Sequence, residues 1–481
     1  MTRQRFVHRV WILCATALVL VASACTGASR PQAADEILTE AAETAAPTAT
    51  DDPTSSAPPA ANGNTPVSRG EDTVAAPAPG APLPESDTDV KEAGPRLYSG
   101  AADTLGITDD KIVICAHAAL TYAAAFNTSA DDLNVYWEEV NAKGGVNGRQ
   151  VEVTYENDNY SGPDAIAAAE RCKAKKPSMI IGGIGFDQIP GVRDWAETNK
   201  YLYVHHTATM EGSAGKNYSF TALPSTEKTG EMFAELALWK FKNKKIGIIG
   251  RDSLNWVPGI KAFKKKAAGK LNIVKEVYTP KDHHNYSLEI SQMQAAGAEV
   301  VWGWESALAT LEMIQQAKSV NYSPQWMVFP FNLQSQTLGA QALNPPVIGL
   351  AMFNSYSYHD YSGEFAKYGD DIKAFERQYA KYRPNVDLEG VGRDLLFLNW
   401  QGMKGLHGLL ASCGRDCTRN KIADVIRTAT YDRSGSVCGV DFTRPGHTQR
   451  GGWQVSVMQA YQSPSGRVNF RNIATCKEHL I

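Results

Sequence analysis

The 481-residue chain lacks the motifs that mark the commonest enzyme classes. It contains no G-x-S-x-G nucleophile elbow, no H-E-x-x-H metal motif and no phosphate loop of the G-x-x-x-x-G-K-[ST] type. It also lacks an excess of basic residues, because 48 lysines and arginines stand against 51 acidic residues. A near-neutral chain offers little electrostatic attraction to nucleic acid. We therefore expect neither an enzyme nor a nucleic-acid-binding protein.

Long apolar runs are also missing beyond the N-terminus, which has the composition of an export signal. Three arginines in the first nine residues precede the apolar stretch 10–21, which is too short to span a bilayer comfortably. Ala22-x-Ala24 suits an ordinary signal peptidase, whereas the following Cys25 resembles the lipidated cysteine of a lipobox. Ala22 stands where a lipobox prefers Leu, so plain secretion stays an alternative. We predict a signal peptide over 1–24 and a lipid anchor on Cys25, at the outer face of the cytoplasmic membrane.

Aromatic residues are almost absent from the segment 25–104, which consists mainly of Ala, Pro, Thr, Ser, Gly and acidic residues. Such a segment cannot bury enough apolar surface to offset its ordering entropy. Acidic residues outnumber basic ones several-fold in it, so the negative charge belongs to a solvated spacer. We expect this segment to be a disordered tether that holds a folded part away from the membrane.

Cysteine is scarce, with eight in the whole chain and only six beyond residue 25. An even number in an oxidising compartment predicts disulfides, for which six cysteines permit fifteen connectivities. A zinc site at Cys413-x-x-x-Cys417 would need a second paired motif, and the adjacent histidines at 205–206 and 283–284 would point to opposite faces of a strand. We therefore expect no metal and the pairs Cys115–Cys172, Cys413–Cys417 and Cys438–Cys476.

From about residue 105 the sequence alternates between strand and helix patterns. A capping box at Ser129 and a second start signal at Ser161 predict two helices in the first part. The short apolar runs that we interpret as strands are 111–115, 150–155, 179–181, 201–204, 245–250, 273–278, 299–304, 325–329 and 348–353. Further helices are predicted over 363–383, 388–412 and 418–430. This alternation predicts an α/β protein with parallel sheets, and nearly 380 residues are too many for one core.

One tract is specific enough to suggest a family. Residues 141–149 read NAKGGVNGR and are followed by the strand-like 151–153, with a helix end, a double glycine and an Asn-Gly turn at fixed spacing. Similar tracts follow in the same order at 181–183, 204–209, 252–259, 300–305, 445–447 and 451–452. From about residue 105 to the C-terminus the chain resembles the Leu/Ile/Val-binding protein family, the type I periplasmic binding proteins of ABC importers.

The resemblance implies a Venus-flytrap fold of two doubly wound parallel-sheet lobes joined by a three-strand hinge. The first lobe would contain 105–223 with 354–433, and the second 224–353 with 434–481. The chain would cross between them near 223–224, 354–355 and 433–434. The ligand would lie between the lobes, where the C-termini of strands and the N-termini of helices meet, because helix N-termini suit a carboxylate.

The resemblance also points to candidate ligand contacts. Amino-acid-binding members present Ser or Thr hydroxyls after the third strand, but this chain has Gly185, Phe186 and Asp187 there, and Asp187 would repel an anion. Trp256 stands at the family's cleft Tyr position, and Glu305 is a candidate for binding an ammonium group. The full set of candidates is Tyr122, Phe126, Gly185, Phe186, Asp187, His206, Thr207, Trp256, Trp304, Glu305 and Asn332. Core packing for the tryptophans and helix capping for Glu305 remain alternatives.

Together these features predict a monomeric, extracytoplasmic solute-binding protein that delivers a small molecule to the permease of an ABC importer. The aromatic candidates and the missing hydroxyls make a branched-chain amino acid less expected than a solute with aromatic or apolar character. A sensor of the same fold, signalling to a membrane partner, is the alternative. No cofactor is expected. Gly183-x-Gly185 resembles the start of a dinucleotide-binding fingerprint, but Gln188 stands where the fingerprint has its third glycine.

Overall fold

The computed structural model describes one folded body. The described residues are 95–122, 128–182, 185–205, 216–329, 342–351, 368–388, 393–431, 438–444, 451–462, 466 and 468–481. They all belong to the second of two compact units, 87–481. The predicted signal peptide, the lipidated Cys25 and residues 25–94 of the predicted tether lie outside the described residues. For residues 95–104 the expected disorder is wrong, because Tyr98 is buried in the core and its N–H donates to the Asn420 side chain at 3.1 Å. Within the described ranges, no helix combines the length and the apolar character that a membrane span requires.

A five-stranded sheet forms the first half of the folded part. Its order is β2-β1-β3-β4-β5, and all its neighbours pair in parallel. The strands are β1 (Lys111–Ala118), β2 (Gln150–Asn157), β3 (Met179–Gly182), β4 (Tyr203–His205) and β5 (Ser219–Thr221). The associated helices are α2 (Ala130–Leu133), α3 (Val135–Ala142), α4 (Gly162–Ala174), α5 (Ile189–Asn199), α11 (Tyr368–Tyr382), α12 (Arg393–Cys413) and α13 (Arg419–Arg427).

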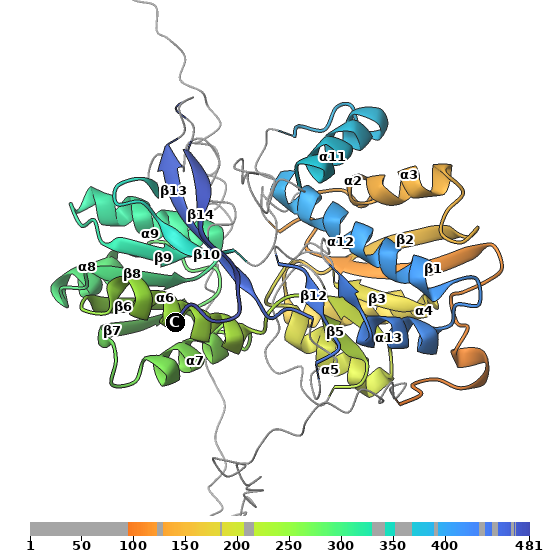
Figure 1. Ribbon diagram of the computed structural model, residues 1–481, viewed down its shortest axis with the longest axis horizontal. Helices are drawn as coiled ribbons and strands as arrows, with labels where there is room; N and C mark the ends of the chain where they lie inside the picture. The colour runs from red at the N-terminus through yellow and green to blue at the C-terminus, as the bar shows by residue number, and fades with distance from the viewer. Residues whose placement is uncertain are drawn as a thin grey trace, which may run out of the picture. The chain divides into compact units, whose positions relative to one another are not determined.

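Both faces of this sheet are covered, as its apolar strands predict. Ile112, Ile114 and Ala116 of β1 belong to the core that includes α3 and α12, which lie on one side of the sheet in Figure 1. Cys115 and Ile180 point to the other face and pack with α4 and α5. This alternation gives each strand two buried faces and explains its continuous hydrophobic run.

The tract at 141–149 is a structural turn. The Asn141 side chain accepts from the backbone N–H of Val151 at 2.8 Å and donates to its carbonyl at 2.9 Å. Gly145 has φ +74°, and a Cβ there would lie 1.9 Å from the carbonyl oxygen of Arg149. Glycine is therefore required at this position, and the tract fixes how α3 returns to β2.

A seven-stranded sheet of order β14-β13-β10-β9-β8-β6-β7 forms the second half. From β7 to β10 all neighbours pair in parallel, whereas β13 and β14 form an antiparallel hairpin beside β10. The strands are β6 (Lys245–Arg251), β7 (Asn272–Thr279), β8 (Val300–Trp304), β9 (Gln325–Val328), β10 (Ile348–Ala351), β13 (Val455–Gln462) and β14 (Val468–Lys477). Its helices are α6 (Thr226–Phe241), α7 (Val257–Ala267), α8 (Ser287–Ala295) and α9 (Ala307–Ser319).

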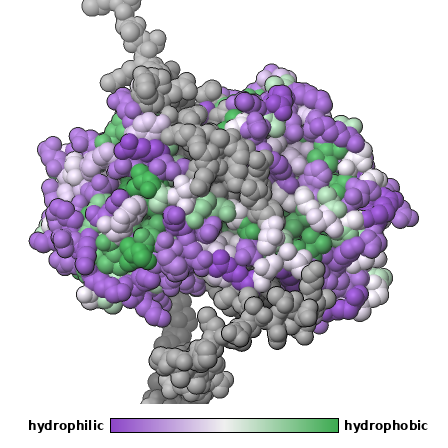
Figure 2. Space-filling model, in the orientation of Figure 1, coloured by the Kyte–Doolittle hydropathy of each residue, from purple (hydrophilic) through white to green (hydrophobic). Residues whose placement is uncertain are grey.

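Tryptophans fill the core between this sheet and its helices. Trp302 and Trp304 are two residues apart on β8 and therefore lie on one face of the sheet, in the same core, where both are at most 1% exposed. Trp302 stacks on Phe263 of α7 with ring centroids 4.4 Å apart, and Trp304 lies 4.9 Å from Phe329. Hydrophilic residues dominate the described surface in Figure 2, with hydrophobic residues in separate patches, so most of the large apolar side chains lie inside.

Three chain segments come together where the two halves are connected. The backbone N–H of Gly451 donates to Thr221 at 2.8 Å, and that of Asp441 donates to Gly451 at 2.8 Å. Asp441 belongs to β12 (Val440–Asp441), which pairs with β11 (Thr430–Tyr431). These segments adjoin the crossovers expected near 223–224 and 433–434; the crossover near 354–355 lies outside the described residues. The lobe boundaries themselves stay a prediction.

Three disulfides connect separate elements, and their pairings are those expected from the sequence. Cys115–Cys172 joins β1 to α4. Cys413–Cys417 joins the end of α12 to the segment before α13. Cys438–Cys476 joins the segment before β12 to β14.

Candidate functional site

The C-terminal ends of strands from both sheets contribute one connected group of polar and aromatic side chains. In open α/β sheets this edge is where ligands usually bind, because loops and helix N-termini meet there. From the first sheet the group takes residues after β1, β2 and β3, and from the second sheet residues after β6, β7 and β8. It contains ionic contacts, hydrogen bonds and stacked rings that join the two halves.

Asp187 is the central contact from the first sheet. It follows β3 and precedes α5, and its side chain is only 8% exposed. Its carboxylate accepts from Arg251 Nη1 at 2.6 Å, from Ser253 Oγ at 3.0 Å and from Trp256 Nε1 at 3.0 Å. All three donors come from the short segment 251–256 at the end of β6, so one carboxylate receives three bonds from the other half.

Arg251 carries a second buried carboxylate. Its guanidinium donates to Glu305, the residue after β8, with Nε and Nη2 each 2.9 Å from the same carboxylate oxygen. Glu305 also accepts from Thr279 Oγ1 at 2.9 Å and from the N–H of Ser306 at 2.8 Å. Burial lowers the pKa of Arg251, but the negative charges of Glu305 and Asp187 outweigh burial and raise it above its ordinary value. Arg251 is therefore permanently charged.

Aromatic rings line this ionic group. Phe186 and Trp256 lie 5.4 Å apart between centroids, and the guanidinium carbon of Arg251 lies 5.4 Å from the Trp256 ring. The Asn255 side chain donates to the carbonyl of Phe186 at 3.2 Å. Trp304 Nε1 donates to the carbonyl of Trp256 at 2.7 Å, which fixes the segment that presents the donors.

A second set of contacts joins the halves beside the first. Tyr122, after β1, stacks on Tyr160 with centroids 4.7 Å apart, and its hydroxyl donates to Asp282. Lys281 donates to the carbonyl of Tyr160 and lies about 5 Å from both rings. Burial raises the pKa of both phenols, Tyr122 and Tyr160, so both stay protonated at neutral pH. Asp282 and Lys281 follow β7, so this set also joins the first half to the second.

A buried hydrogen-bond network supports these residues from the first sheet. Asp158 is fully buried and accepts from His117 Nδ1 at 2.7 Å, from the N–H of Tyr160 at 2.9 Å and from Gln188 Nε2 at 3.2 Å. His117 Nε2 lies 2.8 Å from the hydroxyl of Tyr203. Asp158 thus holds the backbone at Tyr160 and the side chain of Gln188, the residue that follows Asp187.

The structure brings together part of the predicted set. Phe186, Asp187 and Trp256 meet in one cluster, and Tyr122 lies in the neighbouring one. Gly185 has φ +135°, and a Cβ there would come within 1.9 Å of the Gln188 amide, so this turn requires glycine. Phe126, His206, Thr207 and Asn332 lie outside the described residues.

Two further candidates are covered in this conformation. Trp304 is 1% exposed and packs in the core, and the Glu305 side chain is fully buried against Arg251. Their contact with a ligand stays a prediction. Sequence reasoning missed Arg251, Ser253, Tyr160, Lys281 and Asp282. The available signal was their position, because each lies at or just after the C-terminal end of a strand.

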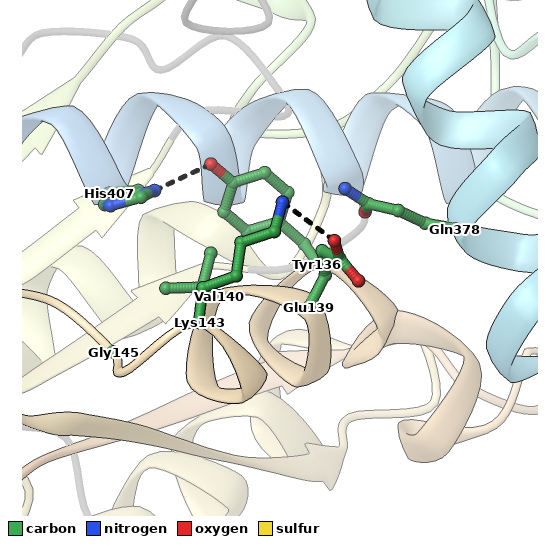
Figure 3. Close-up of a pocket in the computed structure, with 7 residues that line it drawn as sticks. All are labelled: Tyr136, Glu139, Val140, Lys143, Gly145, Gln378 and His407. Atoms are coloured by element: carbon green, nitrogen blue, oxygen red, sulfur yellow. Dashed lines mark hydrogen bonds and ion pairs between the residues drawn. The ribbon is translucent and has the colours of Figure 1, made fainter.

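A separate cavity of about 170 Å³ lies on the helical face of the first half, among α3, α11 and α12 (Figure 3). In it the Tyr136 hydroxyl contacts His407 Nδ1 at 2.9 Å. Hydrogen bonds from Lys143, Lys381 and Tyr382 lower the pKa of Glu139 to about 2. The lining residues are Tyr136, Glu139, Val140, Lys143, Gly145, Gln378 and His407. None of them was a predicted ligand contact. Among the described side chains no group of three His, Cys, Asp or Glu is placed to hold a metal ion.

Parallel sheets with a polar and aromatic group at their strand ends are typical of proteins that hold a small ligand there. Over residues 121–462 the chain matches the periplasmic binding protein family, and it belongs to that family. The resemblance stated from the sequence and the α/β fold with parallel-sheet lobes are thereby confirmed.

One curated relative is the leucine-, isoleucine-, valine-, threonine- and alanine-binding protein of Pseudomonas aeruginosa. It is 22% identical over 241 residues, which make up 49% of this chain and 62% of that protein. The match therefore spans less than two thirds of the relative's length.

Solved structures share the fold over most of the chain. A fatty acid ABC transporter substrate-binding protein from Thermomonospora curvata has a TM-score of 0.61 and 15% identity, covering 78% of this chain and 94% of that one. A solute-binding protein of an ABC transporter from R. palustris, in complex with 4-hydroxybenzoate, has a TM-score of 0.62 and 16% identity, covering 77% and 98%. A branched-chain amino acid transporter substrate-binding protein from Streptococcus pneumoniae, in complex with isoleucine, has a TM-score of 0.58 and 14% identity, covering 76% and 100%.

Proposed function

We propose that this protein is an extracytoplasmic receptor that captures a small solute between its two halves and delivers it to an ABC importer. The observation that carries the proposal is the set of buried contacts around Asp187, Arg251 and Trp256, at the edge where strands of both sheets end. Family membership supports the same function. The protein acts by binding and has no catalytic role.

Closure of the two halves is the signal that an importer reads. A solute that contacts both halves stabilises the closed form, because those contacts exist together only there. The described conformation already joins the halves through Asp187–Arg251 and Tyr122–Asp282. A solute must therefore enter while these contacts are open and must replace or complement them when the halves close.

The chemistry of the site favours a compact solute with an apolar or aromatic body. Phe186, Trp256, Tyr122 and Tyr160 supply ring surface, and Arg251 and Asp187 supply opposite charges. Relatives of this fold are named for amino acids, a fatty acid and hydroxybenzoate. Among these classes the site residues favour a solute with a ring or a short apolar chain and at least one charged group.

Membrane anchoring completes the proposal. Lipidation of Cys25 would hold the folded part at the outer face of the cytoplasmic membrane, with the acidic segment 25–94 as its tether. Mass spectrometry of the mature protein from its host tests this, since an intact, unlipidated Cys25 or cleavage without lipid would contradict it.

Two measurements test solute capture and delivery. Native mass spectrometry of freshly purified protein, followed by thermal-shift screening of amino acids, aromatic acids, fatty acids and amines, should identify a bound solute. Small-angle scattering with saturating solute should then show the dimensions of a protein whose two halves are in contact, because the solute stabilises the closed form. The loaded protein should stimulate ATP hydrolysis by the importer whose genes adjoin its own. A failure of every solute class to bind would contradict the proposed function, and binding without importer stimulation would favour a sensor.

A further inference from the structure

We infer that segment 251–256 is a binding site for the carboxylate of a small organic acid, and that Asp187 is an internal competitor occupying it when no ligand is bound. The inference rests on the proposed solute-binding function and names the group that is recognised. Here "the carboxylate receptor" means the side chains of Arg251, Ser253 and Trp256. It would take a monocarboxylate with a compact aromatic or apolar body.

The geometry of the carboxylate receptor is that of a complete anion site. A guanidinium N–H, a hydroxyl and an indole N–H converge on one carboxylate at 2.6, 3.0 and 3.0 Å. Arg251 and Trp256 are at most 4% exposed, so water has little access to their polar atoms. Charge-assisted bonds of this kind are stronger than neutral ones. These donors need an acceptor whenever the halves are closed.

The adjoining helix adds to the attraction. Helix α7 (Val257–Ala267) begins directly after Trp256, and no side chain of its own caps its N-terminus. The positive end of the helix dipole therefore lies beside the carboxylate receptor. An anion held there gains from both the side-chain donors and the helix.

Asp187 is suited to leave the site. Among the described residues, every side-chain hydrogen bond to its carboxylate comes from the carboxylate receptor, and none comes from its own half. It lies on the short turn between β3 and α5, two residues after Gly185 with φ +135°. When the halves separate, Asp187 moves to water while the carboxylate receptor stays assembled.

Glu305 keeps the carboxylate receptor assembled after Asp187 leaves. It holds the Nε edge of Arg251 from within the second half, so the Nη1 that bonded Asp187 keeps its direction. An incoming carboxylate thus replaces one negative charge with another at Arg251. The aromatic rings of Trp256 and Phe186 would then contact the body of the acid.

The inferred competition predicts that removing Asp187 tightens the binding of simple acids. A site that its internal competitor occupies nine times in ten has its apparent affinity reduced about tenfold, because only the free fraction binds. We would measure binding of benzoate, phenylalanine and benzylamine to the full mature chain by isothermal titration calorimetry. Asp187→Ala should increase the affinity for benzoate about tenfold or more relative to the native chain. Phenylalanine should gain less, because its ammonium group loses Asp187 as a partner, and benzylamine should not gain.

Control variants separate the carboxylate receptor from general loosening of the closed form. Asp282→Asn weakens the second contact between the halves without touching the carboxylate receptor, and it should leave the order of the three probes unchanged. Adding Ser253→Ala or Trp256→Phe to Asp187→Ala should weaken benzoate binding several-fold. Asp187→Asn, which keeps the side chain's shape, serves if the alanine variant unfolds at a lower temperature.

Three outcomes would overturn the inference. The first is that Asp187→Ala leaves the affinity for benzoate unchanged or reduces it. The second is that adding Ser253→Ala or Trp256→Phe to Asp187→Ala does not weaken benzoate binding. The third is that no carboxylate binds to any variant. If the solute screen still finds a ligand of another class, the proposed capture function survives while the carboxylate inference fails.

Discussion

Replacing Arg251 by methionine should destabilise the protein far more than replacing an exposed basic residue. Arg251 neutralises Glu305, whose side chain is fully buried, and Asp187, whose side chain is 8% exposed. Removing one partner of a buried ion pair costs about 3–5 kcal/mol, because the other charge remains out of water. Asp187 can regain water when the two halves separate. Glu305 cannot, since its other partners, Thr279 and Ser306, lie in the same half.

The double variant Arg251→Met, Glu305→Met should recover most of this loss. With Glu305 gone as well, its fully buried carboxylate no longer lacks a cation, and an apolar pair of similar volume is often neutral or stabilising. Asp187 is left to regain water. The interaction between the two substitutions should therefore be favourable by about 2 kcal/mol or more, as a double-mutant cycle measures it. Thr279 and the N–H of Ser306 lose an acceptor, which keeps the recovery incomplete.

Urea unfolding followed by fluorescence, with all disulfides intact, measures these free energies. Lys244→Met is the matched control, because Lys244 forms an exposed ion pair with Glu299 at 2.7 Å and its loss should not change the unfolding midpoint measurably. The reasoning is refuted if Arg251→Met is as stable as the control, or if the double variant is as unstable as the sum of its single substitutions.

Three further predictions follow from other parts of the chain. Removing the disulfide Cys115–Cys172, which closes a loop with a sequence separation of 57, should lower the free energy of unfolding by about 4 kcal/mol. Removing Cys413–Cys417, with a separation of 4, should lower it by about 2 kcal/mol. Urea unfolding of the two double-alanine variants checks this order. Gly452→Ala should lower the melting temperature by several degrees, because its Cβ would lie 2.1 Å from the backbone carbon of Leu223. Gly369→Ala, where nothing lies within 4 Å and φ is not positive, is the control for crowding. Burial lowers the pKa of His407, so as the pH falls the unfolded chain binds a proton there before the folded chain does. The free energy of unfolding should therefore decrease as the pH drops below about 6.5, until the lowered pKa is reached. His407→Gln should reduce this pH dependence in unfolding curves measured between pH 5 and 8.

The strands of the parallel sheets could be predicted because burial on both faces produces unbroken apolar runs. The runs at 111–115, 179–181 and 245–250 coincide with β1, β3 and β6. The hairpin of β13 and β14 was missed because residues such as Ser456, Gln459 and Asn472 interrupt its apolar pattern. β5 has only three residues and carries too little pattern to detect. Sequence periodicity thus finds central strands more readily than additions at a sheet's edge.

The cysteine pairs were predictable for a different reason. Cys413 and Cys417 are four residues apart, and Cys115 and Cys172 belong to a predicted strand and the helix that follows the next one. In an alternating α/β chain such elements pack against each other. Nothing comparable connects Asp187 to Arg251, which lie 64 residues apart on different sheets. Their contact depends on how the two halves approach, which local pattern does not encode.

Asp187 shows why residue type alone was an incomplete guide to the site. From the sequence its charge argued against an anion in this loop, since like charges repel. In the structure the same charge is the anion, held by donors from the other half. When a side chain of the receptor itself bonds the groups that recognise the ligand, the two halves can close without a ligand. The measured binding free energy is then the difference between the ligand's contacts and the internal contacts that the ligand replaces. On this argument the strength of the Asp187–Arg251 contact sets which acids bind at all, because only those that outcompete a tethered carboxylate can enter.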